Sequence, residues 1–199
     1  MPETGLSPNR IRQHLRRRWP IYLIGAVLLC FLNNLIFTVT RPRTPERALL
    51  RVMLVNVDAP EAELEALEQT LLAAAQSAEP DVRAVELEPL QYLGESDAGS
   101  AILLATKFAA GGADLYIADA ASCEVMAARG FCAALDAGAL PGAELLTDPE
   151  TGMPCAVRLD AGDLFPGAEG EICIFVSAGA DNPAAALAAL QNLTSGVNG

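Results

Sequence analysis

The stretch Ala113–Asp119 has the sequence ADLYIAD, and its short apolar run indicates a buried strand. Gly111 and Gly112 come directly before it and are typical of the end of a helix. On its other side, Ser122 can cap a short helix that stops at Gly130. A buried strand between two helices predicts an α/β domain.

The pattern repeats toward the N-terminus. Residues 51–57 and 82–90 are strand-like runs, and each is followed by a helical pattern. Asp58 and Glu61 have the spacing of a capping box for the first helix, and Gly99-Ser100 opens the second. Strands and helices that alternate in this way imply right-handed crossovers onto a parallel sheet.

Toward the C-terminus, a loop over residues 136–152 separates this unit from two more strands, residues 155–159 and 172–177. A last helix is expected over 183–193, starting at Asn182-Pro183. The sequence therefore predicts a single three-layer α/β domain with a mostly parallel sheet over residues 50–195, followed by a tail, 196–199.

The N-terminal part indicates a membrane anchor. Arg16, Arg17 and Arg18 precede an uncharged run, residues 21–39, that as a helix would span roughly 28 Å. We predict one transmembrane helix, an uncleaved signal anchor, over residues 20–40. A cleaved secretory signal would have a shorter apolar core, and a lipoprotein signal would need a small residue before Cys30.

The basic residues predict the orientation of that anchor. Five arginines lie before the apolar run and four follow it within residues 41–51, and three of the first five are at its edge. This bias places a basic segment, residues 1–19, in the cytoplasm and the domain outside the cell membrane, joined by a tether over residues 41–49.

The charge of the domain restricts its partners. Residues 52–199 carry four basic and 23 acidic side chains, a net charge of −19. Such a surface is a poor partner for nucleic acid or for anionic lipid headgroups, and its usual consequence is solubility.

Four cysteines lie in the domain, at Cys123, Cys132, Cys155 and Cys173. Two disulfides with three connectivities are compatible with that count, and so are four buried thiols, which their apolar neighbours favour. There is no Cys-x-x-Cys pair, and the one histidine, His14, precedes the apolar run. We expect no metal site and no cofactor.

One segment resembles a known family. Residues 107–136 (KFAAGGADLYIADAASCEVMAARGFCAALD) are similar to the first lobe of bacterial extracellular solute-binding proteins, as are residues 147–159 and 172–193. Members of that family have two lobes that close over a ligand. The resemblance implies a one-lobed, membrane-anchored relative of this family.

Polar side chains follow two of the predicted strands and are the candidate ligand-binding residues. Asn56 and Asp58 follow the first strand, and Asp119 and Ser122 follow the third. In open α/β sheets, ligands bind beyond the carboxyl ends of the strands. For Asp58 and Ser122, helix capping is the alternative interpretation.

No nucleophile elbow, phosphate-binding loop or HExxH motif is present, so we expect no catalytic residue. The leading hypothesis is a non-catalytic binding module that contacts a small solute or an envelope protein. The alternative is a structural or accessory subunit of an envelope or transporter complex that docks a protein partner.

Overall fold

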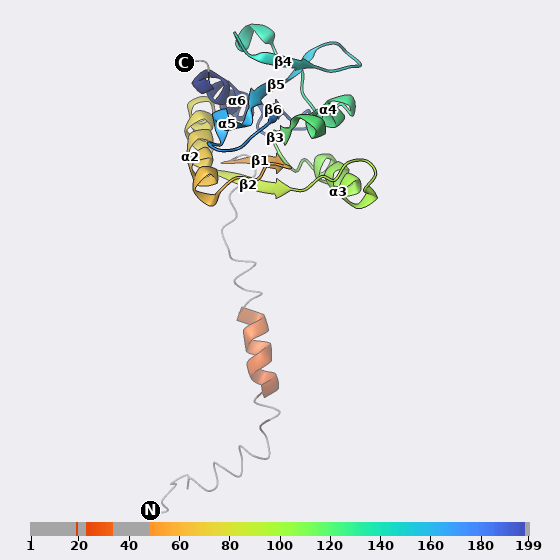
Figure 1. Cartoon of the computed structure of the whole chain (residues 1–199). Helices are drawn as coiled ribbons and strands as arrows, with labels where there is room; N and C mark the ends of the chain where they lie inside the picture. Colours follow the sequence, from red (N-terminus) through yellow and green to blue (C-terminus); the bar gives the residue numbers. More distant parts are fainter. Residues whose placement is uncertain (1–18, 20–22, 34–47, 198–199) are drawn as a thin grey trace, which may run out of the picture. The chain divides into compact units, whose positions relative to one another are not determined.

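The structure is a computed structural model that describes Trp19, residues 23–33 and residues 48–197. The chain divides into two units, residues 1–43 and 44–199. In the first unit, residues 23–33 are helical. The second unit holds all the elements labelled in Figure 1.

The structure describes only part of the predicted anchor. Residues 20–22 and 34–40 lie outside the described residues, as do residues 1–18, 41–47 and 198–199. Within the described ranges, no helix combines the length and apolar character needed to cross a membrane.

Six strands form one sheet in the order β2-β1-β3-β6-β5-β4. β1 pairs in parallel with β2 and with β3, and the pairs β3–β6, β5–β6 and β4–β5 are antiparallel. The bounds are β1 Leu49–Val55, β2 Ala84–Leu90, β3 Leu115–Asp119, β4 Glu144–Thr147, β5 Pro154–Asp160 and β6 Glu171–Val176.

The prediction of a mostly parallel sheet is wrong, since three of these five pairings are antiparallel. The reason is the length of the links. A parallel neighbour needs a crossover of about a dozen residues or more, usually a helix. The link between β5 and β6, residues 161–170, holds only the short helix α5 (Ala161–Leu164), so β6 runs back along β5.

Helices cover both faces of the sheet, which confirms the three layers (Figure 1). α2 (Glu61–Ala78) and α6 (Pro183–Val197) pack together on one face, and α3 (Ala98–Ala109) and α4 (Ala120–Ala128) lie on the other. Alternate residues of β1 face the two cores: Leu50, Val52 and Leu54 the first, Met53 and Val55 the second.

The helix starts differ from the prediction. α2 begins after Pro60 with no side-chain cap, so the capping box of Asp58 is wrong. α3 is capped by Asp97 and begins at Ala98, one residue before the predicted Gly99. The hydrogen bond from the Ser100 N–H to the Asp97 carboxylate lowers the pKa of Asp97.

One strand was not predicted. β4 lies within the stretch 136–152 that was interpreted as a loop, which also holds a short 3-10 helix, Ala137–Ala139. β4 is a four-residue edge strand with no buried residue, so it lacks the apolar pattern by which strands are recognised.

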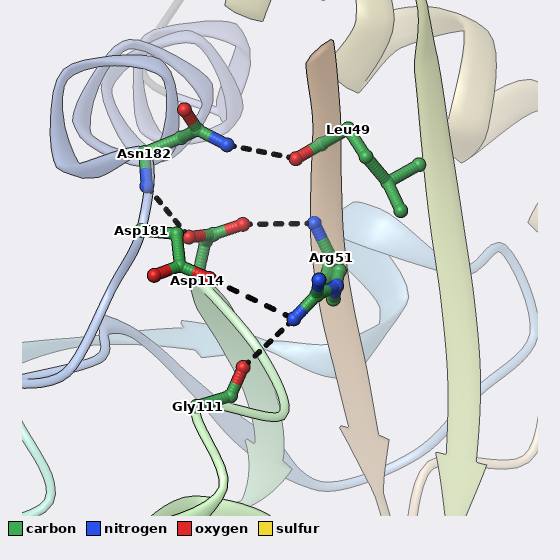
Figure 2. A network of polar contacts seen from close by, with 6 residues as sticks. All are labelled: Leu49, Arg51, Gly111, Asp114, Asp181 and Asn182. Atoms are coloured by element: carbon green, nitrogen blue, oxygen red, sulfur yellow. Dashed lines mark hydrogen bonds and ion pairs between the residues drawn. The ribbon is translucent and has the colours of Figure 1, made fainter. Parts of the chain in front are cut away.

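A buried carboxylate fixes the edge of the sheet at which β1 and β3 begin (Figure 2). Asp114 is 3 % exposed. Its Oδ2 accepts a hydrogen bond from the Arg51 N–H at 3.0 Å, and its Oδ1 accepts one from the Asn182 N–H at 2.8 Å. Asn182 also donates from Nδ2 to the Leu49 carbonyl at 2.8 Å. One side chain thus joins β1, β3 and the start of α6.

Asp114→Asn is expected to lower the free energy of unfolding by about 2 to 3 kcal/mol, because an amide accepts with one oxygen only and leaves one buried N–H facing its NH2 group. Urea unfolding of the chain measures the change. Asp181→Asn is the control. Asp181 is half-exposed and 3.7 Å from Arg51, so its loss should cost less than about 1 kcal/mol. Equal effects of both changes would contradict the role of Asp114.

Candidate functional site

The candidate site lies where β1, β2 and β3 end. β2 and β3 flank β1 in parallel, and the connecting helices α2 and α3 leave to opposite faces of the sheet. Ligand crevices of open α/β sheets form at such a reversal of strand order. Asp119 is the last residue of β3, and the other three candidate residues follow β1 or β3, so all four come to this edge.

Asn56 joins the loops after β1 and β2. Its Nδ2 donates to the Tyr92 carbonyl at 2.7 Å and to Ser122 Oγ at 3.1 Å, and its Oδ1 accepts from the Tyr92 N–H at 2.8 Å. Its φ of 55° lies in the left-handed region, which Asn tolerates better than most residues. Both amide protons are used within the protein, so Asn56 positions the site rather than binding a ligand through its NH2 group.

Asp119 and Ser122 begin α4. The Asp119 carboxylate caps the helix by accepting from the Ser122 N–H at 3.3 Å. The expectation that Ser122 caps this helix is therefore wrong, because the cap is Asp119, one turn earlier. Ser122 is 3 % exposed, and its hydroxyl accepts from Asn56. The structure brings Asn56, Asp119 and Ser122 together as a structural unit.

Asp58 is placed differently, because its exposed carboxylate lines a pocket and caps no helix. The pocket has a volume of about 610 Å³ and lies between the loops after β1 and β2. Apolar side chains predominate in its lining, and the polar ones are Asn56, Asp58, Gln91 and Tyr92. The apolar lining residues are Leu54, Val57, Pro89, Leu90 and Leu93.

Sequence reasoning missed the loop after β2, residues 91–93. Leu90 ends β2 beside Val55, the last residue of β1, so the two loops start side by side. The backbone bond from the Asn56 N–H to the Leu90 carbonyl, at 3.0 Å, holds them together. The rule that ligands bind beyond the carboxyl ends of the strands selected Asn56 and Asp58 as candidates. It applies equally to Gln91, which follows the second strand.

The charge of this pocket is negative. Asp58 is the one ionisable carboxylate in the lining, and the lining holds no basic residue. A ligand with an apolar body and one cationic or hydrogen-bond-donating group therefore fits the lining best.

In the described ranges, no group of three or more His, Cys, Asp or Glu side chains is arranged to hold a metal ion. Comparisons of the chain with protein-family models, with curated proteins and with solved structures found no match.

Asn56→Ala is expected to lower the free energy of unfolding by about 2 to 3 kcal/mol, since it removes three hydrogen bonds and alanine tolerates a positive φ less well than asparagine does. Asn56→Gly removes the same hydrogen bonds, but glycine adopts a positive φ without strain, so it should lower the free energy of unfolding by about 1 kcal/mol less than Asn56→Ala does. Urea unfolding of both variants provides the comparison. Losses below about 0.5 kcal/mol in both would contradict the proposed role of Asn56.

Proposed function

We propose that the chain is a membrane-anchored, extracytoplasmic, non-catalytic binding module whose domain is related to one lobe of the bacterial extracellular solute-binding proteins. The observation that supports it is the pocket of about 610 Å³ at the carboxyl ends of β1 and β2. Its volume falls within the range of small-molecule sites, about 300–1,000 Å³.

The chemistry of the lining supports a ligand class. Val57, Pro89 and Leu93 offer apolar surface, and Asp58 offers one exposed carboxylate beside it. The net charge of −19 over residues 52–199 adds a field that attracts cations toward the domain. We propose a small amphipathic cation, an apolar body with an ammonium group, as the ligand.

A single domain forms this pocket, so it contacts a bound ligand from one side only. A ligand there buries less of its surface than between two closing lobes, so each contact contributes less and the expected affinity is modest. Retention near the membrane would offset that weakness by keeping the module close to its source or recipient of ligand. The predicted anchor over residues 20–40 would supply it.

A second candidate function, an accessory subunit that docks a protein partner, is favoured by apolar exposure beside the pocket. Leu93 is 61 % exposed, and on α3 Ile102 is 66 % and Leu103 46 % exposed. The Leu93 N–H bonds to Ser100 Oγ at 3.1 Å, which ties this part of the pocket wall to the start of α3. Exposed apolar side chains on one element are typical of protein interaction surfaces.

The test is an NMR titration of residues 44–199, a compact unit that contains the whole sheet and both cores. Adding 2-phenylethylamine is expected to shift the amide resonances of residues 56–58 and 91–93. Phenylethanol has the same shape without the charge and should bind more weakly. The anion 3-phenylpropionate should bind most weakly, because Asp58 repels it.

Asp58→Asn is expected to weaken amine binding about threefold to fivefold, since an exposed ion pair is worth up to ~1 kcal/mol. Asp163→Asn is the matched control. It removes the same charge from another pocket, the one lined by Arg158 and Glu171. An equal loss in both variants would mean that the amine responds only to net charge. No shift with any of the three compounds would sink the small-cation proposal and favour the docking function.

A further inference from the structure

The four cysteines of the domain lie together although their positions in the chain are irregular. Cys123 is on α4, Cys155 on β5 and Cys173 on β6, and Cys132 forms an isolated bridge with Ser177, just after β6. All four are free thiols. Cys123 and Cys173 belong to the second core, and Cys132 packs against it.

The thiols are neighbours in a defined order. The Cys132 thiol raises the pKa of Cys123, the Cys123 thiol raises that of Cys173, and the Cys132 thiol also acts on Cys155. The order of neighbours is therefore Cys155, Cys132, Cys123, Cys173. Three of these thiols are buried, and Cys132 is partly exposed.

Strand register excludes two of the three ways of pairing four cysteines. In the β5–β6 pair, Cys173 lies opposite Arg158, and Cys155 precedes Arg158 by three residues on β5. That offset is about 10 Å, whereas the Cα atoms of a disulfide lie within about 7 Å of each other. The connectivity that contains Cys155–Cys173 is therefore excluded.

The same reasoning excludes a Cys132–Cys173 bond. Cys132 lies opposite Ser177, and Cys173 is four residues before Ser177 on an extended strand, about 13 Å away. The remaining connectivity joins Cys123 to Cys173 and Cys132 to Cys155. Both of these pairs join neighbouring thiols, and Cys123 and Cys173 lie in the same core.

We propose that these cysteines form a redox site, in which a small disulfide such as oxidised glutathione converts the four thiols into the disulfides Cys123–Cys173 and Cys132–Cys155. Each disulfide of the product joins neighbouring cysteines, so the strands need not move to form it. This proposal does not depend on the ligand proposed for the pocket.

Oxidation enters at Cys132, which small molecules reach first. Its thiolate attacks the small disulfide and expels one small thiol. Cys123 then attacks the sulfur of Cys132, expels the second small thiol and forms Cys123–Cys132. Cys173 next attacks the sulfur of Cys123, which forms Cys123–Cys173 and releases Cys132 as a thiolate.

A second small disulfide joins Cys132 to Cys155 by the same two attacks. In total, four protein thiols and two small disulfides give two protein disulfides and four small thiols, so atoms and electrons balance. Hydrogen bonding to a neighbouring thiol, together with burial, raises the pKa of Cys123 and Cys173. Burial likewise raises the pKa of Cys155. The buried thiols are therefore expected to react slowly by themselves, and Cys132 carries the exchange.

The test uses the full chain with Cys30→Ser, reduced and then incubated with oxidised glutathione under native conditions. Free thiols are alkylated at acidic pH, and linked peptides are identified by mass spectrometry without reduction. We expect the pairs 123–173 and 132–155, no alkylated cysteine and a higher Tm than that of the reduced chain. Any other final connectivity overturns the proposal. So do four alkylated thiols after a treatment that oxidises the urea-unfolded chain.

Two variants test the entry point. Cys132→Ser should slow formation of the Cys123–Cys173 bond at least tenfold, because the buried pair loses its route to the oxidant. Cys155→Ser, the matched control, should form that bond at the rate of the parent chain and leave Cys132 as a free thiol. Equal rates in the two variants would overturn the entry through Cys132.

Discussion

The carboxylate of Asp114 is the interaction on which the arrangement of the domain depends. It receives the backbone N–H groups of Arg51 and Asn182, from segments that are far apart in the sequence. The backbone of Asp114 itself donates to the Arg51 carbonyl and accepts from the Ser177 N–H. One buried residue thereby sets β1 beside β3, β6 beside β3 on the other side, and α6 across the start of β1. A buried carboxylate without these donors would cost several kcal/mol, so the three segments are held together or not at all.

The two edges of the parallel strands consequently differ. At the edge where β1 and β3 begin, donors and acceptors are paired around Asp114 (Figure 2). At the edge where they end, Asn56 joins the loops after β1 and β2 by hydrogen bonds to Tyr92, and a pocket lies between these loops. The exposed Asp58 and the apolar surface of Val57 and Leu93 lie at that pocket. Fixing one edge by internal bonds while the other presents a pocket is the physical basis of the proposed binding function.

The sequence predicted the positions of five strands and four helices because each is a continuous apolar or periodic run. It predicted the parallel pairing of β1 with β2 and β3, but not the antiparallel pairings of β6, which depend on links such as residues 161–170. It also did not predict β4, which buries no side chain. The carboxyl-end rule brought Asn56, Asp58, Asp119 and Ser122 to one edge, yet the roles of Asn56 and Asp119 depend on hydrogen bonds that no spacing encodes. The grouping of the four thiols likewise depends on the register of β5 and β6.

Native-state hydrogen exchange of the Arg51 and Asn182 amides tests the role of Asp114 most directly. Both amides donate to one buried carboxylate, so they should exchange only when the whole domain unfolds, with the same free energy of opening as the amides at the centre of β3. Their exchange should also respond to denaturant as steeply as global unfolding does. If either amide exchanged through a local opening that denaturant does not affect, the carboxylate would not be holding these segments together.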